Sequence, residues 1–285
     1  MGVRRLAVLL ATLALAGLAA QEARADLQDG VDYLQARQRA SGGFGEPGQP
    51  AEVGLSGWVV LGLRAARAWP DDRDGAGDYL TGRADPAVTD LELRLLALKA
   101  LGRNVGTLAN RLEDYRQAGG RIGPTVNSTI WGVIALRAAG RRVPAATVRY
   151  LKRRQGPSGG WSWYADGQAD SNDTAAAIQA LRAAGVPSSK PVIRRGLAFL
   201  RRLQNDDGGF ELTFGRGSDA PSTAWAIQGF LSAGKKPGPK AFRYLRRLQR
   251  ANGSYRYSRD YVSNPTWTTA QVVAALARRP FPLTR

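Results

Sequence analysis

The chain has 285 residues, of which 44% are hydrophobic, and it contains neither Cys nor His. Disulfide bonds are therefore excluded, as are the Cys and His sites that hold zinc, so we expect no metal and no cofactor. The net charge of +18 favours anionic partners in general. Because the arginines fall in pairs on the polar faces of expected helices and no nucleic-acid-reading motif accompanies them, we expect no specific nucleic-acid binding.

The first 25 residues have the pattern of a secretory signal peptide. Two arginines at positions 4 and 5 precede an uncharged apolar stretch at residues 6–20, and a small-x-small cleavage sequence follows at residues 23–25. The apolar stretch has about 15 residues, whereas a helix that spans a bilayer needs roughly 20. We therefore expect cleavage after Ala25, a secreted or extracytoplasmic mature chain of residues 26–285, and no transmembrane segment in that chain.

Two kinds of helical pattern alternate through residues 26–285, which we expect to form one domain. Amphipathic helices are expected at about residues 27–39, 75–83, 105–117, 145–155, 191–204 and 239–250. The segments between them are more uniformly apolar, with side chains at helical spacing such as Ile130, Val133 and Ile134. Because a uniformly apolar helix is packed on several sides, we interpret these segments as inner helices and the amphipathic ones as outer helices.

The inner helices share one register. Three of them end at a glycine, which is typical of a left-handed C-cap; these glycines are Gly140, Gly185 and Gly234. Aligning the glycines places a hydroxyl residue in one column of most units; the column contains Ser56, Leu91, Thr129, Thr174, Thr223 and Thr269. Six inner and six outer helices in a tandem repeat predict an all-α fold, an (α/α)6 toroid closed around a central axis.

Four outer helices are followed by a motif of an aromatic residue and Leu, then Gln, then Gly-Gly or Gly-Ser, then a second aromatic residue. The Gln and final aromatic residue of the four copies are Gln38 and Phe44, Gln155 and Trp161, Gln204 and Phe210, and Gln249 and Tyr255. The motif resembles the QW repeat of squalene and hopene cyclases. The whole helix alternation resembles the toroid superfamily of terpene cyclases and protein prenyltransferases.

This resemblance implies a structural role for the repeat and an acid motif for catalysis. The glycines make a tight turn, the final aromatic residue fills the gap between units, and the Gln is implied to bind the turn to the next inner helix. Class II terpene cyclases protonate an alkene from an Asp-x-Asp-Asp motif before an inner helix. The corresponding residues are 170–173, and the position of the proton donor holds Asn172. Because an amide cannot donate a proton to an alkene, we do not expect cyclisation by that route.

The flanking acids Asp170 and Asp173 remain candidates for a general acid. However, the column of Asp173 consists of residue types that cap helix N-termini, which predicts a capping role for it; the other members are Asp90, Ser128, Ser222 and Thr268. Zinc-dependent prenyl transfer and thioester chemistry, which also occur in the superfamily, are excluded because both require Cys.

Three tryptophans, Trp58, Trp131 and Trp225, share a column on alternate inner helices. Two interpretations remain open: the rings pack as core between helices, or they face the axis and line a pocket. A polar rim is expected above such a pocket; it consists of Asp90, Asn127, Asn172, Asp173 and Asp219. An aromatic pocket under a polar rim accepts a small apolar or planar ligand with a polar end.

Three functions are compatible with these features. The preferred hypothesis is a secreted toroid that is not an active cyclase and binds a small apolar or planar ligand, or a partner, at the mouth of the central cavity. The first alternative is a divergent class II terpene cyclase of the squalene-hopene type, with Asp170 or Asp173 as general acid. The second is a basic scaffold that binds an anionic cell-surface polymer.

Overall fold

A computed structural model describes residues 26–283 of the chain. The expected signal peptide at residues 1–25 lies outside this range. Within the described range the chain is mostly helical, and its only sheet is a pair of antiparallel two-residue strands, β1 (Phe210–Glu211) and β2 (Ser218–Asp219). No helix within residues 26–283 combines the length and apolar character needed to cross a bilayer.

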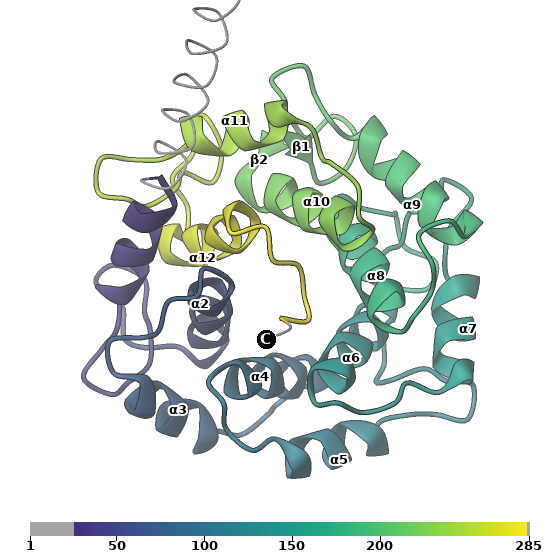
Figure 1. Cartoon of the computed structure of the whole chain (residues 1–285), viewed down its shortest axis with the longest axis horizontal. Helices are drawn as coiled ribbons and strands as arrows, with labels where there is room; N and C mark the ends of the chain where they lie inside the picture. Colours follow the sequence, from purple (N-terminus) through teal and green to yellow (C-terminus); the bar gives the residue numbers. More distant parts are fainter. Residues whose placement is uncertain (1–25, 284–285) are drawn as a thin grey trace, which may run out of the picture.

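The inner helices surround a central axis. In the described residues they are α2 (Val53–Ala65), α4 (Val88–Ala100), α6 (Val126–Ala138), α8 (Ser171–Ala183), α10 (Ala220–Ser232) and α12 (Pro265–Leu276). Each inner helix packs against the next, and α12 packs against α2, so the ring is closed (Figure 1). Most residues of these helices are buried, as their uniformly apolar sequences predict.

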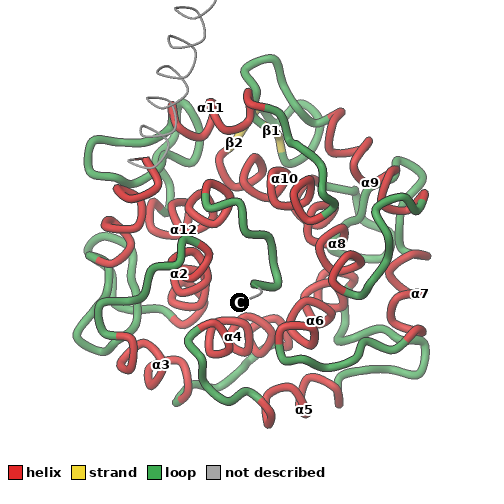
Figure 2. The backbone as a smooth tube through the Cα atoms, in the orientation of Figure 1, coloured by secondary structure: helices red, strands yellow, loops and turns green. Residues whose placement is uncertain are grey.

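The outer helices form a second ring around the first (Figure 2). They are the helical segment at residues 26–35, α3 (Arg73–Thr81), α5 (Gly106–Asp114), α7 (Ala145–Arg153), α9 (Pro191–Arg202) and α11 (Pro239–Arg247). The predicted all-α toroid is confirmed. Several outer helices end earlier than the periodicity predicts, because the chain leaves the helix at the Gln of the repeat motif and pairs it with the following aromatic residue.

The Gln of the repeat motif donates hydrogen bonds to carbonyl groups of its own turn, of the start of the next outer helix, or of both. Gln38 donates from Nε2 to the carbonyl of Gly42 (2.9 Å), inside the turn, and to that of Asp72 (2.7 Å), at the start of α3. Gln249 donates to the carbonyl of Asp26 (2.8 Å), which joins the last unit to the first. The prediction that the Gln binds the next inner helix is therefore wrong. The turn lies against the start of the next outer helix, and the first carbonyl groups of that helix face the turn.

The aligned column of hydroxyl residues ties each turn to its inner helix. The hydroxyl of Thr174 accepts a 2.9 Å hydrogen bond from the backbone N–H of Trp161. The same bond joins Phe44 to Ser56, Ile122 to Thr129, Phe210 to Thr223, and Tyr255 to Thr269. Because a buried N–H without an acceptor costs about 1–3 kcal/mol, this column holds the final residue of the motif in place.

A further copy of the turn follows α5 and was not found in the sequence. Arg116 and Ile122 form the same antiparallel bridge as Gln38 and Phe44. Neither residue matches the motif, so only the Gly-Gly pair that ends at Gly120, with φ of 90°, marked the turn. The backbone geometry of the repeat thus persists where its characteristic side chains are absent.

The unit of α3 and α4 departs most from the repeat. Its column position holds Leu91, which has no hydroxyl group. The loop before α4 is held instead by an ion pair between Asp85 and the buried Arg94, and Arg111 on α5 adds a second contact to Asp85 at 3.0 Å. A buried ion pair here replaces the bridged turn of the other units.

The inner helices end in a common arrangement that defines the C-terminal face of the ring. The C-cap glycines predicted from sequence are confirmed, with φ of 77° at Gly140, 87° at Gly185 and 67° at Gly234. An arginine one turn earlier reaches the last carbonyl groups of the next inner helix, as Arg137 Nε does to Ala183 at 3.0 Å. Arg64 and Arg182 make the same bond to Ala100 and Ser232. These guanidinium groups satisfy carbonyl groups that a helix end leaves without a partner.

Candidate functional site

The three aligned tryptophans meet at the centre of the ring. The ring centroids of Trp58, Trp131 and Trp225 lie 5.3 to 5.8 Å apart, and each pair packs edge to face with interplanar angles of 79° to 85°. Because α2, α6 and α10 alternate around the ring, three rings in mutual contact fill the axis at this level. The rings face the axis, as one of the two interpretations held, but they occupy it rather than line an open pocket.

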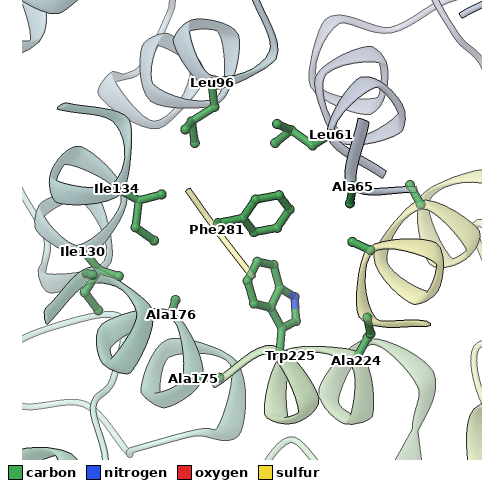
Figure 3. Packing of buried hydrophobic residues seen from close by; sticks show 14 of the residues in the cluster. Leu61, Ala65, Leu96, Ile130, Ile134, Ala175, Ala176, Ala224, Trp225 and Phe281 are labelled. Atoms are coloured by element: carbon green, nitrogen blue, oxygen red, sulfur yellow. The ribbon is translucent and has the colours of Figure 1, made fainter. Parts of the chain in front are cut away.

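The C-terminal segment fills the axis from the C-terminal face. After α12 the chain turns into the ring, and the described part reaches Leu283 (Figure 1). The Phe281 side chain is buried, and its ring lies 6.0 Å from that of Trp225 and 6.5 Å from that of Trp131. Figure 3 shows Phe281 and Trp225 together in the middle of the ring, with Leu61 and Leu96 beside them. The Phe281 N–H also donates to the side-chain carbonyl of Gln179 at 2.7 Å.

The acid motif begins α8 at the opposite end of the ring, the N-terminal face. Asp170 is the N-cap residue, and its carboxylate accepts a 2.8 Å hydrogen bond from the N–H of Asp173. The prediction that Asp173 caps α8 is therefore wrong, because the N-cap lies three residues earlier, at Asp170. The column of Asp173 contains residues of the first helical turn rather than N-cap residues. In the same column, Asp90 and Ser128 bind backward to the N–H of their N-cap residues.

The Asp173 side chain does not cap α8 and instead binds a neighbouring inner helix. The amide of Asn127, on α6, donates a 2.6 Å hydrogen bond to the Asp173 carboxylate, and both side chains are buried. Burial, followed by the negative charge of Asp173, raises the pKa of Asp170 to about 8. Burial also raises the pKa of Asp173, while hydrogen bonds from Asn127 and Asp170 oppose the rise. The two carboxyl groups therefore bind a proton more tightly than ordinary carboxyl groups do.

The remaining rim residues serve their own helices. Asp219 caps α10 by accepting from the N–H of Ser222 at 2.6 Å, and burial raises its pKa to about 6. Asp90 completes the first turn of α4. Asn172, half-buried, accepts a 3.2 Å bond from the Ser171 hydroxyl. The structure thus brings Asn127, Asp170 and Asp173 together but leaves the others apart, and ligand binding by any of these residues stays a prediction.

Glu92, on α4, is a buried acid that belongs to none of the motifs in the sequence. It is fully buried beside Gly132 of α6, and neither carboxyl oxygen has a hydrogen-bond partner among the described residues. Burial, and then the charge of Asp90, raises the pKa of Glu92 well above its ordinary value. The signal was present in the sequence as an acid within an apolar inner helix, a position that carried no family motif.

Exposed aromatic side chains lie at the N-terminal face, on the loops before α8, α10 and α12. The loops that precede the inner helices rest on the first residues of neighbouring inner helices: the carbonyl of Trp163 accepts from the N–H of Val126 at 3.1 Å, and that of Leu212 from the N–H of Ser171 at 2.9 Å. These loops expose several large apolar side chains to solvent, namely Trp163, Tyr164, Phe214, Tyr261 and Val262. We call this set the aromatic rim. It lies at the same end of the ring as the Asp170 and Asp173 carboxyl pair.

Comparison with known proteins identifies a family for the second half of the chain. Residues 141–283 match the family model described as Squalene-hopene cyclase C-terminal domain. No curated protein sequence matches the chain.

Several solved structures share the fold. A variant of the type II terpene cyclase MstE from Scytonema, in complex with its substrate geranylgeranyl dihydroxybenzoate, has a TM-score of 0.70 at 17% identity, covering 90% of this chain and 97% of that chain. A protein from Actinoplanes has a TM-score of 0.67 at 18% identity, covering 90% and 99%. The ent-copalyl diphosphate synthase from Streptomyces platensis has a TM-score of 0.60 at 20% identity, covering 79% and 50%. At these identities the likeness shows the shared fold alone.

Proposed function

Because the chain belongs to the squalene-hopene cyclase C-terminal domain family, we propose that it is a non-cyclising member of that family, which binds a small ligand with an apolar or planar body at its N-terminal face. The observation that carries this proposal is the mutual contact of Trp58, Trp131 and Trp225. A cyclase must fold its substrate in a cavity that excludes water, and the three rings occupy the axis where such a cavity would lie.

The acid groups support the same conclusion. Protonation of an alkene demands a strong acid that stays un-ionised until the reaction. The family position of the donor holds Asn172, which has no acidic proton. Asp170 retains a proton, but its pKa of about 8 makes it a weaker acid than an ordinary carboxyl group. A proton held beside the charge of Asp173 is poorly suited to transfer to a hydrocarbon.

The aromatic rim supports binding at this face. Large apolar side chains that several loops expose at one face of a domain often mark an interaction site. Trp163 and Phe214 are 46% and 55% exposed, and both stand on loops anchored to the inner helices by backbone hydrogen bonds. Anchored aromatic rings lose little conformational entropy on binding, so they suit a planar or apolar ligand.

Binding is tested with Nile red, an uncharged planar dye, titrated into the purified mature protein. We expect saturable binding that falls at least fivefold in a Trp163→Ala, Phe214→Ala double variant. Tyr115→Ala is the matched control, because Tyr115 is 43% exposed and lies outside the aromatic rim. Absence of saturable binding, or an equal loss in the control, overturns the proposal.

A second candidate function, a divergent class II cyclase, is favoured by one observation: Asp170 and Asp173 form a buried carboxyl pair that retains a proton next to Asn127. Incubation with squalene and with geranylgeranyl diphosphate, followed by mass spectrometry of the extract, separates the two functions. A cyclised product that disappears in Asp173→Asn establishes the cyclase and overturns the binding proposal. If the substrates stay unchanged with both the wild type and the variant, the cyclase function is excluded.

Two further proposals concern export of the protein and its binding to an anionic cell-surface polymer. Export directed by residues 1–25 is tested by fractionating cells that express the full chain and the chain lacking those residues. Retention on an anionic polymer at low salt, with loss at high salt, tests the scaffold function. Retention that is insensitive to salt contradicts it.

A further inference from the structure

The C-terminal face of the ring carries a pocket of ≈540 Å³. It lies where α2, α3 and α4 approach the C-terminal segment, on the opposite face from the aromatic rim. The residues that line it are Leu61, Arg64, Arg67, Trp69, Arg73, Leu96, Lys99, Ala100, Gly102, Ala138, Arg279 and Leu283. Five of these lining residues are cationic and none is acidic.

Two guanidinium groups are held in fixed positions at the pocket. Those of Arg64 and Arg73 lie over the ring of Trp69, at 3.3 and 4.0 Å from its centroid. Arg64 donates from Nε to the carbonyl of Ala100 at 3.2 Å, and Arg73 donates from Nη2 to that of Leu101 at 2.7 Å. Arg64 also donates from Nη1 to the carbonyl of Ala68 at 2.8 Å. The Nη2 group of Arg64, and the Nε and Nη1 groups of Arg73, make no hydrogen bond to the described residues and can bind another acceptor. Groups fixed in this way bind a ligand without a further cost of ordering.

Four cations of the pocket have no carboxylate partner among the described residues. Among residues 26–283, no acid forms an ion pair with Arg64, Arg67, Arg73 or Lys99. Burial, and then the charges of Arg279 and Arg73, lowers the pKa of Arg64. Outside the pocket, by contrast, Arg103 pairs with two acids of α3. Like charges gathered in a concave site create a potential that attracts an anion.

The floor of the pocket is apolar. Leu61 and Leu96 point toward the axis beside Phe281 (Figure 3), and Ala138 completes the floor from α6. A cationic entrance above an apolar floor matches a ligand with an anionic head and an apolar body. Pockets of several hundred cubic ångströms suit small molecules rather than extended polymers.

We propose that this pocket binds an alkyl phosphate or diphosphate, with the phosphate oxygens on Arg64 and Arg73 and the alkyl chain between Leu61 and Leu96. The planar guanidinium fork matches the geometry of phosphate oxygens and forms paired hydrogen bonds with them. Arg67 and Lys99 are exposed at the entrance, and their side chains add charge without a hydrogen bond or ion pair to other described residues. This site is independent of the ligand proposed for the N-terminal face.

Isothermal titration at 0.15 M salt with decyl phosphate, below its micelle concentration, tests the site. We expect one saturable site in the mature protein and at least tenfold weaker binding of decanol, which lacks the anionic head. An Arg67→Gln, Lys99→Gln double variant should weaken decyl phosphate binding about tenfold, because both charges are lost and neither side chain supports the fold. The matched control is Lys235→Gln with Lys236→Gln, which removes the same charge after α10, across the ring.

A second variant tests the floor. Ala138→Leu narrows the apolar part of the pocket, so it should weaken decyl phosphate binding while leaving the affinity for inorganic pyrophosphate unchanged; its thermal unfolding confirms that it folds. Decanol binding as tightly as decyl phosphate overturns the proposal. An equal loss of decyl phosphate affinity in the Lys235 and Lys236 control also overturns the proposal. Heparin binding without any decyl phosphate binding also overturns it, because a polymer then recognises the basic face as a whole.

Discussion

The side-chain amide of Asn127 on α6 donates a 2.6 Å hydrogen bond to the carboxylate of Asp173 on α8. The bond crosses between neighbouring inner helices at the N-terminal face, and both side chains are buried. It joins the carboxyl pair of one unit to the unit before it. Position 173 thus bridges two units, although its column within the repeat predicts only a helix cap.

Replacing Asn127 by Leu tests this bridge. The variant removes a donor that lowers the pKa of Asp173, so that pKa should rise further, and the unpaired buried carboxyl should destabilise the fold by about 1–3 kcal/mol. Urea unfolding at pH 7 measures the stability, and carboxyl NMR measures the pKa. Asn172→Leu is the control, since Asn172 is only half-buried and bonds just to Ser171; an equal loss there contradicts the bridge.

The proton on Asp170 predicts a pH-dependent stability. Its folded pKa of about 8 lies above the ordinary value of 3.8, so the folded state holds a proton that the unfolded state releases. The stabilisation is fully present below pH ~4 and is lost as the pH rises toward 8. Asp170→Asn should flatten this decline, because Asn still caps α8 but does not titrate. Chemical unfolding from pH 4 to 9 gives the comparison, and parallel curves for the two proteins refute the assignment.

Glu92 carries a buried carboxyl group without a partner among the described residues. Glu92→Leu, which has a similar volume, should therefore stabilise the protein by about 1–3 kcal/mol at pH 7. Asp90→Ala in the same helix should have the opposite sign, because Asp90 accepts a 3.0 Å bond from the N–H of Ala87. Denaturant midpoints of both variants test the contrast. Destabilisation by Glu92→Leu means that the carboxyl group has a partner in solution.

The tryptophan cluster predicts a large cost for opening the axis. Trp225 is 5% exposed and touches Trp58, Trp131 and Phe281. Trp225→Ala should destabilise the protein by about 3–5 kcal/mol, since the surrounding helices are closed into a ring and collapse only in part. Trp163→Ala, at an exposed position, should change stability by less than about 0.5 kcal/mol. Equal shifts of the two unfolding midpoints contradict a filled axis.

The repeated turns could be anticipated because each one is encoded locally. The helix period separated inner from outer helices, and Gly140, Gly185 and Gly234 marked the ends where only a residue without Cβ adopts positive φ easily. The sequence does not predict the turn at Arg116 and Ile122, because that turn keeps the backbone bridge of the repeat without its side chains. It predicts the wrong role for Asp173, because the column of Asp173 lies three residues past the N-cap, which is Asp170.

The sequence by itself determined the all-α toroid, the order of its units and the absence of an acid at position 172, because each depends on residue type and on spacing within one unit. The tertiary structure alone decided that the rings of Trp58, Trp131 and Trp225 fill the axis and that Asp173 pairs with Asn127. It also decided that cations of α2, α3 and α4 gather in one pocket on the C-terminal face, whose described lining residues include no acid. These contacts join residues of different units. The distances between these residues depend on the radius of the ring, which is set where α12 packs against α2. The sequence period within a single unit does not encode that radius.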